Sequence, residues 1–393
     1  MRILYLHQFF ITRSGVGGTR SYEFARRFVA RGHEVRMLTA GGGRRVVDGI
    51  DVIGVRGGHG DYVTATATSY PRRAAAFAGF AAAATAQALR GPRPDVVYAT
   101  SPPLTMALPA LAASARWRIP FVFEVRDLWP EAPIQMGALR NPLLQQSARA
   151  LERLVYRRSA RVIALSPGIR DGVLAAGVPS GKVALVPNAA DLELFSPDVD
   201  GSEVRARVAG GRGFVCSYFG TMGEANDLTQ VVEAAPLVDD VTFVLMGDGK
   251  RRPELERLAR ERQATNVVFE RPAASKEEVA RLAAASDACL TVFKNVPILA
   301  TNSPNKLFDT LAAGRPAIVN TPGWMRELVE RSEAGVYVRP GDPRDLADKV
   351  AWLRDHPDAA ERYGRNARAL AERDFGRDEL AERALAVLEE AAG

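Results

Sequence analysis

The residues that could carry out chemistry gather in two segments, one near each end of the chain. Residues 15–20 read Gly-Val-Gly-Gly-Thr-Arg and follow an apolar strand pattern, and residues 302–309 read Asn-Ser-Pro-Asn-Lys-Leu-Phe-Asp after another. Each segment opens a helical pattern, and a helix start offers unpaired N–H groups and a partial positive charge. Both segments therefore predict anion sites, and their wide separation indicates two domains that face one phosphate-bearing ligand.

The late segment also supplies charged side chains for such a ligand. Lys294 ends the preceding strand pattern, Asn305 and Lys306 lie at the helix start, and Asp309 follows one turn later on the same face. A lysine neutralises a diphosphate as a point charge, and a carboxylate accepts hydrogen bonds from ribose or sugar hydroxyls. The alternative interpretation is a surface ion pair between Lys306 and Asp309.

Glycine turns after strands recur along the chain. Gly17 and Gly18 allow the backbone to approach a phosphate or a sugar closely, although a plain tight turn remains an alternative there. The same form returns at Gly220 and Gly223 and again at Gly247. None of these turns has the G-x-G-x-x-G frame of dinucleotide-binding proteins, which disfavours a nicotinamide-dependent dehydrogenase. Their repetition at strand ends predicts a series of phosphate cradles.

Residues 121–131 read Phe-Val-Phe-Glu-Val-Arg-Asp-Leu-Trp-Pro-Glu, an apolar strand that ends in charges. Ligands of parallel α/β sheets bind beyond the carboxyl ends of the strands. This rule makes Glu124, Arg126 and Asp127 candidate catalytic residues, because an acid at such a position can orient or deprotonate an acceptor hydroxyl. A structural ion pair of Arg126 with Asp127 or Glu131 is the alternative.

Composition and charge narrow the class of protein. A chain of 393 residues exceeds what one hydrophobic core usually supports. The net charge of +6 favours anionic partners such as sugar nucleotides or anionic lipid surfaces. The arginines are scattered without a recognition motif or aromatic stacking platform, which argues against nucleic acid. Cys216 and Cys289 lie in apolar runs typical of buried thiols in a reducing compartment, and no zinc-site spacing is present.

Short apolar strands alternate with helical patterns along the chain, which is typical of parallel α/β architecture. The strands are expected at Ile3–Phe9, Glu34–Thr39, Ile50–Val55, Val96–Ala99, Phe121–Glu124, Arg161–Leu165, Val183–Val186, Phe214–Phe219, Thr242–Met246, Val267–Phe269, Ala288–Val292, Ala317–Asn320 and Gly335–Val338. The pattern predicts a first domain over residues 1–196, a polar, glycine-rich linker over 197–212 and a second domain over 213–375. A final helix over about 376–393 follows an interruption at Asp374-Phe-Gly376.

An alanine-rich segment, Ala74–Leu89, contains no charged residue and is flanked by arginines. It is too short and too rich in alanine to predict a membrane span. Two interpretations stay open: a buried helix of the first domain, or a helix that rests on a membrane surface with its arginines on anionic head groups. The chain opens with a strand pattern and not with a charged and apolar leader, so no secretory signal is expected.

Together these motifs resemble the retaining glycosyltransferases of family 4, which have the two-domain GT-B fold, and in particular a WbuB-like bacterial branch associated with amino-sugar transfer. The resemblance spans essentially the full chain. It rests on Leu6-His-Gln-Phe9, Gly17-Gly-Thr-Arg20, Phe123–Glu131, Ser166-Pro-Gly168, Val186-Pro-Asn-Ala189, Gly220–Glu224 and Ser303–Gly314.

The resemblance implies two Rossmann-like, doubly wound parallel sheets that face each other across a cleft. It implies a donor nucleotide held mainly by the second domain and an acceptor held by the first. The donor-binding residues would be Gly17, Gly18, Arg20, Gly220, Gly223, Gly247, Arg271, Lys294, Asn305, Lys306 and Asp309. The catalytic candidates are Asp127, Glu124, Arg126 and Lys306, and the acceptor would meet His7, Trp129 and Glu131.

Two departures from the family pattern concern the donor site. The family often carries a pair of glutamates where this chain has Thr301 and Asp309. The basic residues usual after the first strand of the second domain are replaced by the glycines and acids of Met222–Asp227. Neutralisation of a diphosphate must then rest on Lys294, Lys306 or Arg20.

The resemblance implies metal-independent transfer of a sugar, with retention of configuration, from a UDP-linked donor to a sugar, lipid-linked or small-molecule acceptor. The donor is a substrate, so no cofactor is expected. The implied location is cytoplasmic, with peripheral contact at the inner face of the membrane left open. Two other functions fit the sequence: a sugar-nucleotide 2-epimerase of the same architecture, and a catalytically silent protein that binds a glycan or a lipid.

Overall fold

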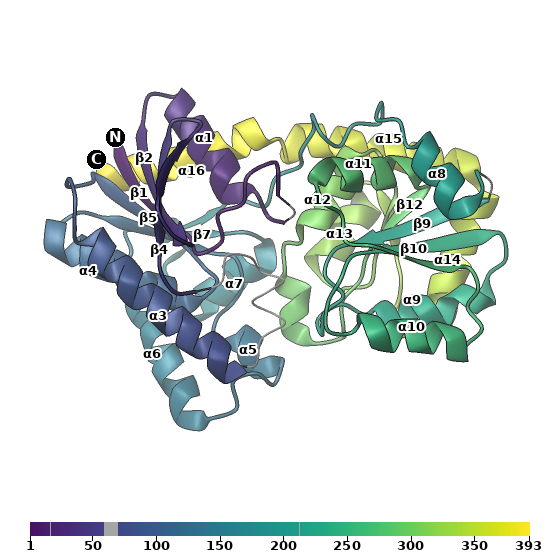
Figure 1. Cartoon of the computed structure of the whole chain (residues 1–393), viewed down its shortest axis with the longest axis horizontal. Helices are drawn as coiled ribbons and strands as arrows, with labels where there is room; N and C mark the ends of the chain where they lie inside the picture. Colours follow the sequence, from purple (N-terminus) through teal and green to yellow (C-terminus); the bar gives the residue numbers. More distant parts are fainter. Residues whose placement is uncertain (16, 59–69, 212) are drawn as a thin grey trace.

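The computed structural model describes residues 1–15, 17–58, 70–211 and 213–393, and these form two α/β units that lie side by side (Figure 1). The first unit contains a sheet in the order β3-β4-β2-β1-β5-β6-β7-β8, in which only β3 pairs antiparallel to its neighbour. Its strands are β1 (Arg2–Leu6), β2 (Glu34–Ala40), β3 (Arg44–Val47), β4 (Ile50–Val55), β5 (Val96–Thr100), β6 (Phe121–Val125), β7 (Arg161–Ala164) and β8 (Val183–Leu185). Its helices are α1 (Arg20–Ala30), α3 (Tyr70–Ala88), α4 (Ala107–Trp117), α5 (Glu131–Gln135), α6 (Pro142–Arg158) and α7 (Pro167–Ala175), with short turns η1 (Leu104–Met106) and η2 (Ser180–Lys182).

The second unit contains a parallel sheet in the order β11-β10-β9-β12-β13-β14. Its strands are β9 (Phe214–Phe219), β10 (Val241–Met246), β11 (Val267–Glu270), β12 (Ala288–Thr291), β13 (Ala317–Val319) and β14 (Gly335–Tyr337). The helices that follow β8 in the chain are α8 (Ser202–Ala209), α9 (Leu228–Ala234), α10 (Arg252–Glu261), α11 (Lys276–Ala285), α12 (Asn305–Ala312), α13 (Trp324–Arg331), α14 (Pro343–Asp355), α15 (Pro357–Asp374) and α16 (Arg377–Ala392), with η3 (Ala235–Leu237) and η4 (Pro297–Thr301).

The central strands of both sheets are buried along their whole length. Every residue of β5, β6 and β9 is buried, as expected for parallel strands that are covered by helices on both faces. Cys216 and Cys289 are buried free thiols in the second sheet, which confirms the prediction made from their apolar surroundings. The doubly wound architecture is therefore confirmed, and the carboxyl ends of the strands carry the loops of interest.

Several details differ from the predictions. The first strand was predicted to reach Phe9 but ends at Leu6, and the backbone N–H of His7 makes one further hydrogen bond to the carbonyl of Leu38 in β2. The antiparallel strand β3 was not predicted. The range 197–212, predicted as a linker, contains α8, which packs against α11 and is tied to its last residue where Arg205 donates to the carbonyl of Ala285. The glycines after α8 mark its end, and residue 212 lies outside the described part of the chain.

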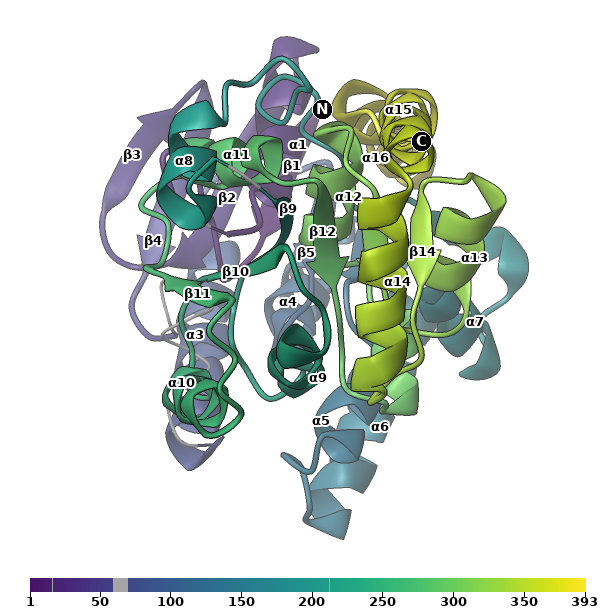
Figure 2. The ribbon, with the colours of Figure 1, turned by 90° about the vertical axis from the view of Figure 1, so that its right-hand side faces the viewer.

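The chain crosses between the units twice, and the two crossings touch. The backbone N–H of Ala190 donates to the carbonyl of Phe375 over 2.8 Å, in a short parallel bridge between Ala190 and Gly376. The predicted interruption at 374–376 is confirmed, since α15 ends at Asp374 and α16 begins at Arg377. Helix α16 then packs on α1, β5, β6 and β7 of the first unit, near the N-terminus (Figures 1 and 2).

The alanine-rich segment forms α3, which packs on α4. Phe80, Ala84 and Ala88 are buried, whereas Ala78 and Ala82 on the other side of the helix are exposed. One face of α3 therefore belongs to the core, and the other is open to the surroundings. None of the helices in the described ranges is long and apolar enough to cross a membrane.

Candidate functional site

The early glycine segment and the late asparagine–lysine segment meet at the junction of the two units. A Cβ atom placed on Gly18 would lie 3.1 Å from the Nδ2 atom of Asn305 and 3.2 Å from the Nη2 atom of Arg126. Gly17 has a φ of +140°, a conformation that side chains rarely adopt. Three of the residues predicted for the site, from three distant parts of the chain, therefore meet at one point, where a side chain on residue 18 would make tight contacts with the other two.

Lys306 lies beneath a glycine turn of the second unit. Its Nζ atom donates to the hydroxyl of Tyr218 over 2.7 Å and to the Oδ1 atom of Asn226 over 3.2 Å. A Cβ atom on Gly220 would lie 3.3 Å from the same nitrogen. No carboxylate of the described residues forms an ion pair with it, and burial lowers its pKa to about 7. The ammonium group of Lys306 is thus held by neutral oxygen atoms, without a carboxylate partner among the described residues, beside the glycine turn at Gly220.

The alternative of a Lys306–Asp309 surface pair is wrong. Asp309 is buried and pairs with Lys276 at the start of α11, with 3.5 Å between Nζ and Oδ2. Burial raises the pKa of Asp309, and the nearby Lys276 opposes this rise. Sequence reasoning missed Lys276, because its partner lies on another helix and no local spacing links the two.

Arg20 and Glu124 pair with each other inside the first unit. The Nε and Nη2 atoms of Arg20 donate to Glu124 over 3.0 and 2.8 Å, and Glu124 also accepts from the hydroxyls of Tyr98 and Thr100. Burial disfavours the charged form of Glu124, but Arg20 outweighs this effect and the pKa stays below its usual value. In this structure the guanidinium of Arg20 is therefore held by Glu124, and the Glu124 carboxylate is held in turn by Arg20, Tyr98 and Thr100.

Arg126 and Asp127 form no such ion pair with any of the described side chains. The Nη1 atom of Arg126 donates to the Nε2 atom of His7 over 3.3 Å, and the Nδ1 atom of His7 lies 2.8 Å from the hydroxyl of Ser21. Because arginine can only donate, Nε2 accepts and the ring proton lies on Nδ1. Burial, and then Arg126, lower the pKa of His7, so its ring is neutral. His7 therefore positions Arg126 and does not neutralise it.

Asp127 is partly buried and has no ion pair or side-chain hydrogen bond with any of the described residues. Burial raises its pKa, and the neighbouring Arg126 opposes the rise. The expected structural pair of Arg126 with Asp127 or Glu131 does not form, since Glu131 accepts from Arg149 over 2.8 Å. Trp129 is partly buried and its ring meets Phe77 of α3 edge-on. Asp127 is thus a carboxylate without a side-chain partner among the described residues, next in sequence to Arg126.

The remaining basic residues predicted for the donor are already paired. Lys294 lies 3.3 Å from Glu224, which Lys250 also approaches, and the exposed Arg271 pairs with Glu278. The glycine turns themselves are tightly packed. A Cβ atom on Gly247 would lie 1.9 Å from the carbonyl oxygen of Gly220, whereas one on Gly223 would make only an ordinary contact. The turns at Gly220 and Gly247 therefore form one compact layer.

The other motifs behind the resemblance hold the two units together. The hydroxyl of Ser166 donates to the carbonyl of Thr301 over 2.5 Å, and the Nδ2 atom of Asn188 donates to the carbonyl of Ser303 over 2.5 Å. A Cβ atom on Gly168 would lie 3.0 Å from the Cα atom of Thr301. Thr301, at the position of the missing family glutamate, therefore contributes to the contact between the units.

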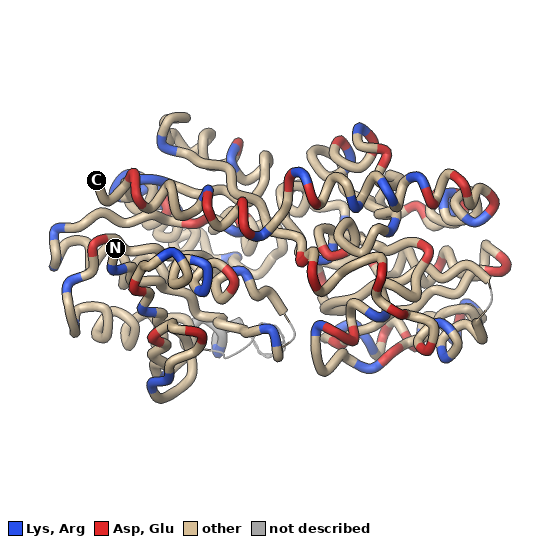
Figure 3. Tube along the Cα trace, turned by 90° about the horizontal axis from the view of Figure 1, so that it is seen from above, with Lys and Arg blue, Asp and Glu red and all other residues tan. Residues whose placement is uncertain are grey.

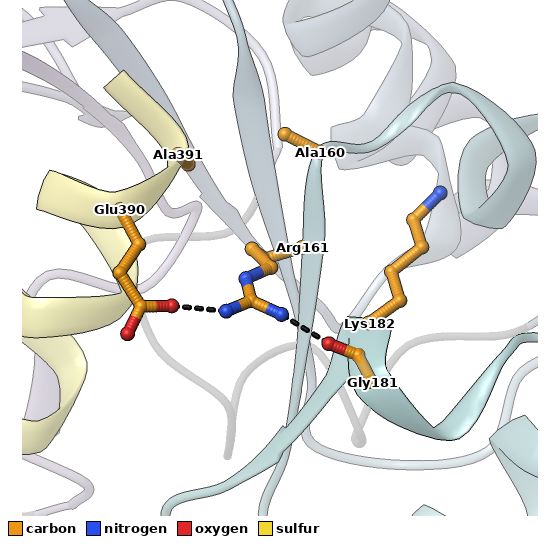
Figure 4. Close-up of a pocket in the computed structure, with 6 residues that line it drawn as sticks. All are labelled: Ala160, Arg161, Gly181, Lys182, Glu390 and Ala391. Atoms are coloured by element: carbon orange, nitrogen blue, oxygen red, sulfur yellow. Dashed lines mark hydrogen bonds and ion pairs between the residues drawn. The ribbon is translucent and has the colours of Figure 1, made fainter. Parts of the chain in front are cut away.

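A surface hollow of about 340 Å³ lies elsewhere, where the last turn of α16 meets the first residue of β7 (Figure 4). There Arg161 donates to Glu390 and to the carbonyl of Gly181. This is the amino end of the sheet, away from the carboxyl ends that carry the junction residues. The contact fastens the end of α16 and lies apart from the candidate site.

Acidic and basic residues are spread over both units and alternate along the Cα trace (Figure 3). Within the part of the chain that the structure describes, no three His, Cys, Asp or Glu residues are grouped so as to hold a metal ion. The described cations that approach the junction without a carboxylate partner are Arg126 and Lys306. These two charges, one from each unit, give the site its electrostatic character.

Comparison with known proteins identifies two glycosyl transferase domains in the chain. The model of the glycosyl transferase 4-like domain matches residues 15–189, and that of glycosyl transferases group 1 matches residues 213–356. Alpha-D-kanosaminyltransferase of Streptomyces kanamyceticus is 24% identical over 57% of this chain. The match spans 58% of that relative's length.

Solved structures share the fold. Sucrose-phosphate synthase of Thermosynechococcus elongatus superposes with a TM-score of 0.80 at 17% identity, covering 99% of this chain and 98% of that one. Anabaena HepE in complex with UDP-glucose superposes with a TM-score of 0.76 at 19% identity, covering 99% and 100%. The two family models together span about four fifths of the sequence. The chain therefore belongs to the family 4 glycosyltransferases and has the GT-B fold.

Proposed function

We propose that the protein transfers a hexose or an N-acetylhexosamine from a UDP-linked donor to a hydroxyl acceptor, with retention of configuration and without a metal ion or cofactor. The observation that carries this proposal is the meeting of Gly18, Arg126 and Asn305 at the junction, with Lys306 under the adjacent glycine turn. Backbone cradles and uncompensated cations are what a departing diphosphate requires.

The donor preference is supported by similarity. HepE, which shares the fold, was solved with UDP-glucose. The name of the kanosaminyltransferase refers to the transfer of an amino sugar, and this supports the proposal of an amino-sugar donor. In this proposal, the nucleotide lies against α12 and the glycine turns of the second unit, and Asp127 orients the acceptor hydroxyl from the first unit.

The test is turnover with UDP-N-acetylglucosamine and UDP-glucose, followed by proton NMR of the product. We expect the anomeric proton to have the configuration of the donor. An inverted product would refute retention. Conversion of the donor to an epimer without any acceptor would favour the epimerase, and binding without turnover would favour a silent binding protein.

We also propose that the protein acts in the cytoplasm at the inner face of the membrane, on a lipid-linked acceptor. Helix α6 begins with two exposed leucines, Leu143 at 72% and Leu144 at 57% exposure, close in sequence to the exposed Arg140. Exposed apolar side chains beside cations suit an anionic lipid surface. Co-sedimentation with phosphatidylglycerol vesicles, with phosphatidylcholine vesicles as the control, tests this. Absence of the protein from both pellets would favour a soluble acceptor.

A further inference from the structure

We propose that Arg126, although it belongs to the acceptor-side unit, binds the diphosphate of the donor. In this role it replaces the basic residues that are absent from the segment Met222–Asp227 after the first strand of the second unit. This inference rests on the proposed function, because it requires a nucleoside diphosphate at the junction. Arg126 of the first unit would thus contact a donor that lies mainly against the second unit.

The position of Arg126 supports this contact. Arg126 follows the last residue of β6, and its backbone N–H donates to the hydroxyl of Ser101 over 3.1 Å. Its Nη2 atom and the Nδ2 atom of Asn305 lie within 3.2 and 3.1 Å of one point, the place that a Cβ atom on Gly18 would take. These two donors, one from each unit, therefore border the same small space beside Gly18, and a phosphate oxygen that contacts both of them would bridge the units.

The charge of Arg126 has no counter-charge of its own. No described carboxylate forms an ion pair with its guanidinium, and among the described side chains only the neutral His7 accepts a hydrogen bond from it. Glu124 lies near enough for Arg126 to help lower its pKa, but that carboxylate already accepts from Arg20 and two hydroxyls. A partly buried cation without an anion is costly, so the position favours a bound anion.

The other candidate cations cannot carry the diphosphate alone. Arg20 is neutralised by Glu124, and Lys294 is paired with Glu224. Lys306 is available, but burial lowers its pKa to about 7, so it is only partly charged near neutral pH. A guanidinium stays charged throughout this range and binds two phosphate oxygens at once. Arg126 therefore supplies the charge that the substituted segment Met222–Asp227 does not.

The experiment compares Arg126→Ala and Arg126→Lys with wild type, and uses Arg383→Ala as the matched control. Arg383 is exposed and pairs with Glu379 on α16, so its removal changes the net charge equally but leaves the junction intact. Calorimetric titrations with UDP, UMP and uridine give the affinities. We expect Arg126→Ala to weaken UDP binding roughly 10- to 100-fold, to leave uridine binding unchanged, and Arg126→Lys to recover part of the loss.

Three outcomes would overturn the inference. Unchanged UDP affinity with a raised KM for the acceptor would place Arg126 on the acceptor. An equal loss for UDP and uridine, with a lower melting temperature, would make its role purely structural. A wild-type protein that binds no nucleoside diphosphate would refute the proposed function itself, and this result is distinguishable because it appears before any substitution is made.

Discussion

Lys306 offers the sharpest quantitative prediction, because its charge in the ligand-free protein depends on pH near neutrality. Burial lowers its pKa from the ordinary 10.5 to about 7. A bound diphosphate favours the charged form and raises this pKa again. Binding of UDP above pH 7 must therefore take up a proton, and its affinity should fall up to about tenfold for each pH unit. Between pH 7 and pH 9 we expect UDP to bind roughly 50-fold more weakly, because the charged fraction of Lys306 falls from about one half to about one hundredth.

The same shift has a consequence for stability. Between about pH 7 and 10.5 the unfolded chain binds a proton at Lys306 that the folded protein does not, so stability rises with pH across this window. Below pH 7 the charged lysine costs on the order of 5 kcal/mol, since its pKa falls from 10.5 to about 7 and one pKa unit corresponds to about 1.4 kcal/mol. Donor binding offsets part of this cost, so the stabilisation by UDP should be larger at pH 7 than at pH 9.

The assay is isothermal titration of UDP at pH 7.0, 8.0 and 9.0 in two buffers with different ionisation enthalpies. Wild type should show proton uptake, whereas Lys306→Met should bind weakly and without dependence on pH. Lys250→Ala is the control, because this exposed lysine lies near Glu224 in the same unit and should leave the slope unchanged. A wild-type affinity that stays constant from pH 7 to 9 would refute the reasoning.

Three further substitutions test other parts of the site. Gly18→Ala should reduce kcat/KM by about tenfold, because the new methyl group would press on Asn305 and Arg126. The control is Gly79→Ala on α3, where a methyl group meets open space and kcat/KM should equal that of wild type. A Gly18→Ala variant with wild-type kcat/KM would argue against this close approach. Asp127→Asn should lower turnover by about 100-fold or more at unchanged UDP affinity, and wild-type turnover would exclude an orienting role. Glu124→Ala should cost about 3 to 5 kcal/mol in urea unfolding, because Arg20 would be left buried and unpaired; an unchanged free energy of unfolding would contradict the assigned pair.

Most of the sheet architecture could be predicted because buried parallel strands leave a strong sequence signal. The fully buried strand Phe214–Phe219 was predicted with its observed ends. The weak strand β3 was missed, since three of its four residues are exposed and its apolar pattern is short. Helix α8 was not predicted, because the glycines that follow it gave the segment the composition of a linker. It packs against α11, and a contact between segments so far apart in the sequence leaves no local sequence pattern.

The candidate site shows the same limit more clearly. Sequence reasoning found the residues that approach the junction, because glycines and charges at strand ends have a local signature. It could not tell which charges were free. Arg20 and Glu124 are 104 residues apart, and Lys276 is paired with Asp309 across two helices. Pairing between elements depends on the folded arrangement, so the distinction between supporting pairs and uncompensated cations required the structure.

The measurement that tests the central claim most directly is thermal melting of the wild-type protein with UDP, GDP, dTDP, CMP and NAD. A ligand present at about one hundred times its dissociation constant adds roughly 2.7 kcal/mol to the free energy of unfolding. We predict a selective rise of the melting temperature with UDP. A rise with NAD alone, or no rise with any nucleoside diphosphate, would contradict the account.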